Sequence, residues 1–385
     1  MADVEVVTTS DGLAALADDW RALWARTPTA RFCESFEWHW NAWDFSHQGT
    51  TSRPLIAVVR ASGRVALILP LIVDRHAGLH RGRWLGARVA FYEGALVDRD
   101  APQNNLLRLA WEALRVEGRL DYVTLENVPE GSDLDRLLQD HPGRFHERRP
   151  VHSVQWNDWV DWDDYWQSRR RRLRQDQGRQ WRRLEAIGPV RFSGRLGGDD
   201  VADVIDWVIE RKLEWMQRLG KRTGWFGERI VPFFRASVQD ANRMGRLYVG
   251  QISVGGQTVA AEVGLADPGA VVAAVTTYAE KWRAYSPGRL LDERSVRWSL
   301  ENGFPGYDFL TGTSQAEILH KSLWAEPRQW SSAYVIPFTG AGRAYVRWFS
   351  SGTRRQIRSA YTRWPELRRR LWLPGDEAGI QQPIE

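Results

Sequence analysis

The sequence predicts an α/β protein in which two halves repeat a similar order of helices and strands. In the first half, a stretch with helical spacing of apolar residues precedes a strand pair, and a helix and a strand follow. In the second half, two helical stretches precede three consecutive strands, and again a helix and a strand follow. Since both periodicities recur in the same order, we expect two mixed, mostly antiparallel sheets flanked by helices.

The N-terminal half, which we assign to residues 1–150, opens with a helix whose predicted N-cap is Ser10. A strand pair follows over residues 54–73, and it turns at Ser62-Gly63. Apolar residues then recur at helical spacing over 107–114 until Gly118, a typical helix end. Residues 121–126 complete this half as a strand.

The C-terminal half, which we assign to residues 151–342, follows a crossing segment at 142–156. Gly255-Gly256 and Asp267-Pro268-Gly269 are typical hairpin turns, and they divide one region into three strands. A basic, helical pattern continues through a tail over residues 343–385. The elements expected in this half are helices over 166–187, 200–219 and 286–302, and strands over 246–254, 257–265, 270–279, 307–310 and 333–338.

The composition is that of a globular protein, because 43% of the 385 residues are hydrophobic and 26% are charged. No apolar run approaches the roughly 20 residues that span a bilayer, and the N-terminus lacks the pattern of a signal peptide. The single cysteine, Cys33, excludes an internal disulfide framework. His76 and His80 approach metal-ligand spacing, but Gly78 would break the helix that aligns them. We therefore predict a cytoplasmic protein without a metal.

Tryptophan is unusually frequent, with 22 residues spread along the chain. Most of them are expected to anchor helices in the core, because the indole is the largest apolar side chain. A few could instead line a groove for sugar rings or for a long acyl acceptor. The sequence does not single these out, although Trp156, Trp159, Trp162 and Trp166 cluster beside the expected domain junction.

The turn Ser286-Pro287-Gly288-Arg289 is the most informative motif, because it opens a predicted helix. The first backbone N–H groups of a helix have no partner within the helix, and they attract phosphate or pyrophosphate. A short strand with Asp308 follows, and then a glycine-containing loop leads to Lys321.

This block resembles the FemAB-like branch of the GNAT acyltransferases, in particular the CelD-like proteins of cellulose biosynthesis. Their pattern is Ser-Pro-Gly, a helix, Asp-Phe, Gly and then aromatic-Lys-x-x-Trp. Here it reads Ser286-Pro287-Gly288, Asp308-Phe309, Gly312 and His320-Lys321-Ser322-Leu323-Trp324, with a histidine in place of the aromatic residue. The resemblance includes the holdfast-type polysaccharide N-acetyltransferases.

The resemblance implies tandem GNAT-like domains in a FemAB-like arrangement, with the basic tail packed on the N-terminal domain. It also implies acyl transfer to an amine from acetyl-CoA or another acyl-CoA, held between two splayed strands at 270–279 and 306–310. The usual CoA loop reads Arg or Gln, two residues, Gly, one residue and then Gly or Ala, whereas the segment from Arg283 to Gly288 has a single glycine and lacks this pattern. An aminoacyl-tRNA donor therefore stays open.

Four side chains are candidates for the chemistry, which needs a base for the acceptor and an acid for the leaving group. Asp308 would orient or deprotonate the acceptor amine, and Lys321 would stabilise negative charge on the donor. Glu262 lies in an apolar strand, so it either faces solvent or sits in a cleft with a raised pKa. Tyr278 could protonate a thiolate, or it could simply be packed.

An arginine-rich run occupies one predicted helix and is either a solvated face or a site for a polyanion. Its repulsive like charges favour the polyanion. The ligand could be a lipid-linked or nucleotide-linked glycan precursor, an anionic inner-membrane surface, tRNA or cyclic di-GMP, whereas DNA is not expected. The residues singled out for this role are Arg169, Arg170, Arg172, Arg179 and Arg183.

Three functions follow from these observations. The first is a cytoplasmic N-acyltransferase, peripheral at the inner membrane, that modifies an amino sugar of an exopolysaccharide, adhesin or cell-envelope precursor. The second is a FemX-like transferase that uses aminoacyl-tRNA on a cell-wall precursor. The third is an effector with a GNAT fold that binds cyclic di-GMP.

Overall fold

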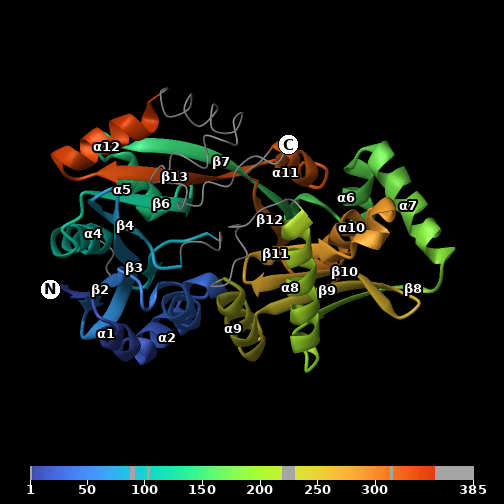
Figure 1. Cartoon of the computed structure of the whole chain (residues 1–385), viewed down its shortest axis with the longest axis horizontal. Helices are drawn as coiled ribbons and strands as arrows, with labels where there is room; N and C mark the ends of the chain where they lie inside the picture. Colours follow the sequence, from blue (N-terminus) through green and yellow to red (C-terminus); the bar gives the residue numbers. More distant parts are fainter. Residues whose placement is uncertain (1, 87–91, 102–104, 219–229, 313–314, 352–385) are drawn as a thin grey trace. The chain divides into compact units, whose positions relative to one another are not determined.

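A computed structural model describes residues 2–86, 92–101, 105–218, 230–312 and 315–351 of the chain (Figure 1). Contacts divide these residues into two compact units. The first unit comprises residues 2–28, 33–149 and 330–351, and the second comprises residues 29–32 and the described part of 150–329. The chain passes from the first unit to the second within strand β7 (Phe145–Gln155). Most of the tail at 343–385 lies outside the described residues.

The first unit has a sheet with the strand order β1-β2-β3-β4-β6-β13. Its strands pair antiparallel except for β4 and β6, which are parallel. The predicted strand pair is confirmed, and its turn places Ser62 and Gly63 at φ of 54° and 79°. The strands are β1 (Asp3–Val7), β2 (Arg53–Ala61), β3 (Arg64–His76), β4 (Leu79–Trp84), β5 (Leu96–Val97), which pairs with β3, β6 (Tyr122–Pro129) and β13 (Gln329–Pro337).

Helices pack on this sheet through apolar faces. Helix α4 contributes Ala110, Trp111 and Leu114 to a core shared with β2 and β3, and it ends at Gly118 as predicted. The first predicted helix breaks at Leu16, and the side chain of Thr9 rather than Ser10 caps it. The helical segments are α1 (Ser10–Ala15), α2 (Ala17–Ala25), η1 (Phe32–Glu34), α3 (Phe36–Asn41), the π-helix η2 (Ala42–His47), α4 (Leu106–Glu117), α5 (Asp133–Gln139) and α12 (Gly340–Ser350).

The second unit has the strand order β7-β12-β11-β10-β9-β8 (Figure 1). Only β11 and β12 pair in parallel here, and the other neighbours are antiparallel. The three predicted strands are confirmed, with Gly255 and Gly256 at φ of 57° and 81° in the first hairpin turn. The strands are β8 (Val190–Leu196), β9 (Leu247–Val254), β10 (Gln257–Asp267), β11 (Ala270–Tyr278) and β12 (Gly306–Thr311).

Helices α8 and α9 pack on strands of this sheet, and α10 packs on β8 to β12. Helix α10 contributes Leu290, Leu291 and Val296 to the two apolar cores of the unit. Within the described residues no helix is both long enough and apolar enough to cross a bilayer. The helical segments are η3 (Trp156–Asp158), α6 (Trp162–Ser168), α7 (Arg171–Glu185), α8 (Val201–Arg218), α9 (Ile230–Arg243), η4 (Glu280–Tyr285), α10 (Pro287–Glu301) and α11 (Gln315–Lys321).

The predicted helix over 166–187 is wrong as a single element, because the chain forms α6 and α7 with an extended break at Arg169 and Arg170. The break has a tertiary cause. The Arg169 guanidinium donates a hydrogen bond to the carbonyl of Trp324 at 2.7 Å and lies 5.1 Å from the ring centre of Tyr165. Strands β7 and β8 and helices α9 and α11 are further elements that the sequence patterns did not predict.

Candidate active site

The parallel strands β11 and β12 pair only near their amino ends. The pairing joins Val271 to Tyr307 and Val272 to Asp308, although β11 continues to Tyr278 and β12 to Thr311. The carboxyl-terminal parts of the two strands are therefore not bonded to each other, as the splayed arrangement requires. Their unpaired backbone groups face a gap in the sheet's hydrogen bonding, where a substrate can find donors and acceptors.

The predicted phosphate turn does begin a helix, because α10 starts at Pro287 directly after the turn. Ser286 adopts a left-handed conformation with φ 51° and ψ 46°, and its side chain caps no backbone N–H group. Instead its hydroxyl accepts a hydrogen bond from Arg289 at 2.9 Å. A Cβ atom on Gly288 would lie 3.7 Å from Tyr278, so this tyrosine borders the turn. The first N–H groups of α10 thus lack a side-chain cap and suit an anion.

Glu262 on β10 is fully buried, so the solvent-facing alternative is wrong. Its carboxyl group accepts a hydrogen bond from the hydroxyl of Tyr307 on β12. Burial raises the pKa of Glu262 to about 8, the Tyr307 hydrogen bond opposes this rise, and the nearby charge of Asp292 adds to it. Beside it, Tyr248 donates to Ser295 of α10 at 2.9 Å. A layer of polar groups therefore lies between the sheet and α10.

Asp308 and Lys321 both attach to the carboxyl end of β12. Asp308 accepts a hydrogen bond from the N–H group of Leu310 at 2.7 Å, and Leu310 has a left-handed φ of 61°. Lys321, the last residue of α11 rather than part of a loop, donates to the carbonyl of Thr311 at 2.8 Å. Burial lowers the pKa of Lys321 against the opposing charges of Glu317, Asp308 and Asp292. The two predicted residues are thus electrostatic neighbours.

An Asp–His pair that the sequence analysis did not assign lies next to Lys321. His320 Nε2 is 2.8 Å from Oδ2 of Asp292 in the second turn of α10. Burial would lower the pKa of His320, but the hydrogen bond and charge of Asp292 raise it above its usual value. The one available signal was the histidine where the resembling family has an aromatic residue. No signal in the sequence indicated that Asp292 would pair with His320, because it lies 28 residues earlier in the chain.

A second histidine of this region, His152 on β7, is less suited to proton transfer. Its Nε2 atom lies 3.1 Å from the hydroxyl of Ser322, and its Nδ1 atom is buried with no hydrogen-bond partner among the described residues. Burial, followed by the charge of Lys321, lowers the pKa of His152 to about 4. We therefore expect this imidazole to stay neutral and structural near neutral pH.

The five predicted arginines do not form one surface. Arg169 is held against Trp324, and Arg179 forms an ion pair with Asp176 at 2.7 Å. Arg183 donates to the carbonyl of Ala284 at 3.0 Å and lies 4.7 Å from the ring centre of Tyr285, so it braces the segment before the phosphate turn. The exposed arginines at the start of α7 are Arg170, Arg171 and Arg172.

A hollow of about 320 Å³ lies where α8 meets the ends of β10 and β11. An indole, two carboxylates and two cationic side chains face it alongside a hydroxyl group. These six lining residues are Trp207, Arg211, Glu214, Thr258, Glu280 and Lys281. Among the described residues, no group of three or more histidine, cysteine, aspartate or glutamate side chains is placed to hold a metal ion.

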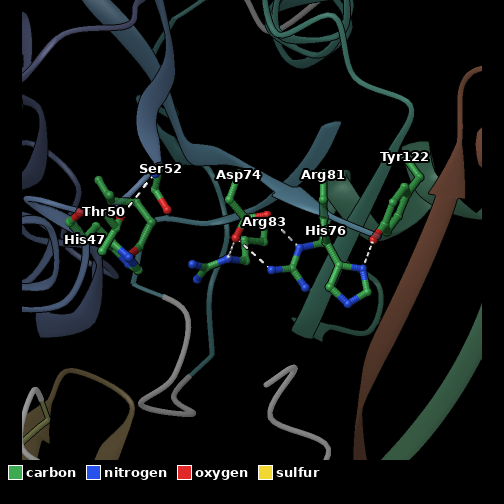
Figure 2. Close-up of polar contacts among 9 residues, drawn as sticks. His47, Thr50, Ser52, Asp74, His76, Arg81, Arg83 and Tyr122 are labelled. Carbon is green, nitrogen blue, oxygen red and sulfur yellow. Dashed lines mark hydrogen bonds and ion pairs between the residues drawn. The ribbon is translucent and has the colours of Figure 1, made fainter. Parts of the chain in front are cut away.

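The first unit contains a different polar cluster, on the hairpin of β3 and β4 (Figure 2). Asp74 accepts hydrogen bonds from Arg81 at 2.9 and 2.7 Å and from Arg83 at 2.8 Å. Burial alone would raise the pKa of Asp74, but the two arginines together lower it to about 2. Beside this cluster, His76 lies 2.6 Å from the hydroxyl of Tyr122. A carboxylate held by two guanidinium groups is a structural ion cluster.

Comparison with known proteins identifies the class of the second unit. A family model described as an acetyltransferase (GNAT) domain matches residues 168–317, which include β8 to β12, α10 and the phosphate turn. These residues therefore match a GNAT acetyltransferase domain, and the match supports an acyltransferase. Among curated proteins, no relative matches the chain.

Solved structures support the fold at low sequence identity. FemX has a TM-score of 0.56 at 12% identity and covers 90% of this chain and 99% of its own. A conserved protein of unknown function from Bacteroides thetaiotaomicron has a TM-score of 0.55 at 12% identity, with coverage of 87% and 100%. The C-terminal domain of a putative lysylphosphatidylglycerol synthetase from Agrobacterium fabrum has a TM-score of 0.53 at 12% identity, with coverage of 87% and 95%. The predicted α/β fold with FemX-like neighbours is confirmed, and the narrower CelD-like resemblance stays a prediction.

Proposed function

We propose that the protein transfers an acetyl group from acetyl-CoA to an amino sugar of an exopolysaccharide, adhesin or cell-envelope precursor, as its CelD-like and holdfast-type resemblance suggests. One observation carries this proposal. The unpaired carboxyl ends of β11 and β12, the uncapped start of α10 and a layer of buried polar side chains occur together in the second unit. Acyl transfer needs these three parts: a gap between strands that holds the thioester, a site that binds its phosphates, and side chains that stabilise charge or transfer protons.

The donor would bind with its pyrophosphate at the first turn of α10. The helix N-terminus carries partial positive charge, and Arg289 adds a full positive charge within the first turn of the helix. The thioester would then lie along the free edge of β11, where a backbone N–H group can stabilise the oxyanion. Tyr278, which borders Gly288, would give a proton to the leaving thiolate.

The acceptor amine would approach the carboxyl end of β12. There Asp308 would orient the ammonium group, and Lys321 would stabilise negative charge on the donor. Glu262 is fully buried, so it would position Tyr307 rather than touch a substrate. The hollow beside Trp207 suits a sugar, because an indole can cover the ring face while Glu214 and Thr258 bind polar groups.

Gly288→Val tests the donor site. The branched side chain would crowd the turn beside Tyr278, so we expect acetyl-CoA affinity to fall by about tenfold or more, roughly 1.4 kcal/mol. Calorimetric titration measures the affinity, and an unchanged melting temperature shows that the fold persists. Gly288→Ala is the matched control, because its Cβ would make only ordinary contacts at 3.7 Å. Intact acetyl-CoA binding in the valine variant would remove the turn from the donor site.

Asp308→Asn and Lys321→Ala test the two charged side chains proposed for the acceptor and donor. Thiol release from acetyl-CoA would be measured with glucosamine, its β-1,4-linked oligomers and UDP-glucosamine as acceptors. We expect each variant to lose roughly a hundredfold in kcat with little change in KM, the usual effect of removing one charged transition-state contact. The double variant should lose less than the product of the two losses, because the residues serve one site. Wild-type turnover in either single variant would remove that residue from the site.

The exposed arginines at the start of α7 favour a second candidate, the FemX-like use of aminoacyl-tRNA. Arg170, Arg171 and Arg172 form a positive surface that suits a phosphate backbone, and the single glycine of the donor turn departs from the usual CoA loop. The same surface could bind cyclic di-GMP or hold the protein at an anionic inner membrane. A thermal-shift panel of acetyl-CoA, charged tRNA and cyclic di-GMP separates these ligands, and stabilisation by tRNA alone would replace the first proposal.

A further inference from the structure

We propose that His320 is the residue that takes the proton from the acceptor amine, and that Asp292 is its positioning residue. This inference rests on the proposed acyl transfer and deepens it, because it assigns the proton-transfer step to two specific atoms. His320 Nε2 would donate to Asp292, and His320 Nδ1 would face the substrate.

The geometry places this pair between the two parts of the candidate site. Asp292 lies one helical turn after Arg289, so it belongs to the α10 segment that follows the phosphate turn. His320 precedes Lys321, whose ammonium group is bonded to the carboxyl end of β12. The imidazole is therefore close both to the start of α10 and to the end of the splayed strand.

Exposure distinguishes the two partners. The side chain of Asp292 is only 6% exposed, whereas that of His320 is 43% exposed. Nδ1 of His320 has no hydrogen-bond partner among the described residues. An ionised carboxylate can only accept hydrogen bonds, so Asp292 fixes the proton on Nε2 and leaves the lone pair on Nδ1. A buried anchor behind a partly exposed imidazole is the arrangement of an oriented general base.

Charged groups of α10 and α11 act on the pKa of His320 in opposite directions. Asp292 and Arg289 approach it from α10, and Lys321 is its neighbour on α11. Asp292 favours the imidazolium, while Arg289 and Lys321 disfavour it. The charge of Asp292 would thus stabilise the imidazolium once the proton arrives.

The other candidates for the base are less suitable. Glu262 is fully buried under Tyr307, and Asp308 is already bonded to the N–H group of Leu310. His152 directs one nitrogen to Ser322 and buries the other. Among the described ionisable groups of this region, His320 combines an oriented ring with an accessible nitrogen.

The reaction balances without any further reagent. Nδ1 of His320 accepts one proton from the acceptor ammonium, and the free amine nitrogen forms a bond to the thioester carbonyl carbon. The carbon–sulfur bond then breaks as the tetrahedral intermediate collapses. The amine nitrogen gives its second proton to solvent, and the leaving thiolate takes one proton from Tyr278 or from the imidazolium. The products are an amide and a thiol.

The test compares His320→Gln, Asp292→Asn and the control Gln315→Ala, an exposed residue at the start of the same helix. Acetyl-CoA binding is measured calorimetrically, and kcat/KM is measured from pH 5.5 to 9.5 with the amine that the wild-type protein acetylates. A general base contributes about a hundredfold or more to the rate. We therefore expect His320→Gln to lose about a hundredfold in kcat while retaining acetyl-CoA affinity, and Gln315→Ala to behave as wild type.

Asp292→Asn provides a readout that a purely structural role would not move. In wild type, kcat/KM should rise with pH as His320 becomes neutral. Loss of the Asp292 charge lowers the pKa of His320, so this rise should shift to lower pH in the variant. Nitrogen-detected NMR of the imidazole should show the same shift and the Nε2–H tautomer in wild type.

The outcomes separate this inference from the function on which it rests. An active wild-type protein whose rate and pH profile are unchanged in His320→Gln overturns the inference and leaves acyl transfer intact. A wild-type protein that binds acetyl-CoA but acetylates no amine overturns both. Loss of acetyl-CoA binding in His320→Gln also overturns it, because the residue would then belong to the donor site.

Discussion

Asp74 of the first unit and Glu262 of the second are both buried carboxyl groups on central strands, yet their surroundings differ. Asp74 is held by the guanidinium groups of Arg81 and Arg83, and its pKa falls to about 2 although burial acts to raise it. Glu262 has a tyrosine hydroxyl as its hydrogen-bond donor, and burial raises its pKa to about 8. The first group stays ionised near neutral pH, and the second stays mostly protonated.

The difference shows that burial alone does not indicate what a carboxyl group does. The oxygens of a carboxylate surrounded by guanidinium groups already accept hydrogen bonds from them, so we assign this carboxylate a structural role. A buried carboxyl group without a cationic partner costs stability when it ionises, and groups with such shifted pKa values are concentrated at functional sites. The polar layer around Glu262 contains Asp292 and Ser295 of α10, which continue into the candidate site.

We expect the largest loss of folding free energy from a substitution that breaks the Asp74 ion cluster. Asp74→Asn would leave two buried guanidinium groups without their carboxylate, which typically costs about 3 to 5 kcal/mol. Urea unfolding at pH 7 measures the loss, and Asp133→Asn in the exposed pair with Arg136 is the control, with an expected change under about 0.5 kcal/mol. Because the pKa of Asp74 is lowered, its contribution is present above about pH 4 and is lost as the pH falls toward 2. Equal stability of variant and wild type at pH 7 would contradict the structural role.

The second prediction replaces Glu262 with glutamine, Glu262→Gln. Glutamine is a neutral isostere that can still accept the hydrogen bond from Tyr307, so the variant removes the titration that distinguishes Glu262 from Asp74. The raised pKa means that wild-type stability is complete below about pH 4.5 and is lost as the pH rises toward 8. We expect the variant to gain on the order of 4 kcal/mol over wild type by pH 8, since the pKa rises from 4.5 to about 8 and each pKa unit is worth about 1.4 kcal/mol. Parallel stability curves between pH 5 and 8 would show that Glu262 titrates normally. Glu301→Gln, in the exposed pair with Arg297, is the matched control.

The smallest effect on stability concerns the exposed arginines of α7. Replacing Arg170, Arg171 and Arg172 with glutamine should change the free energy of unfolding by less than about 0.5 kcal/mol, because exposed charges contribute little. Binding to tRNA or to phosphatidylglycerol vesicles should weaken, and the slope of log K against log salt should fall by about 2 if these residues contact phosphates. An unchanged slope for both probes would identify them as a solvated surface. Arg169 is left intact, because it supports Trp324.

Local patterns predicted those elements whose cause lies within a few residues. The strands of the second unit were predictable because two adjacent glycines with positive φ permit the tight turn between β9 and β10. The start of α10 was predictable because proline is favoured in the first turn of a helix. The boundary of α4 followed from Gly118 in the same way.

Elements with a tertiary cause were missed. The helix break at Arg169 depends on the carbonyl of Trp324, 155 residues further along the chain. The Asp292–His320 pair joins α10 to α11 across 28 residues of sequence, and the short α11 has no buried residue whose pattern would have predicted it. Asp308 and Lys321 were singled out from a family motif and from a glycine loop that could turn the chain back to the end of their strand, and their contacts at the end of β12 became visible in the structure.

The hydrogen bond between Asp308 and Leu310 has an entropic consequence. A free aspartate side chain samples several rotamers, and ordering it on ligand binding costs conformational freedom. Here the Leu310 N–H group already fixes the carboxylate at 2.7 Å, and the left-handed φ of Leu310 directs that N–H group toward it. A substrate ammonium group would therefore meet a carboxylate that folding has already ordered. The backbone strain at one leucine thus prepares a polar contact that a flexible side chain could offer only at a cost in entropy.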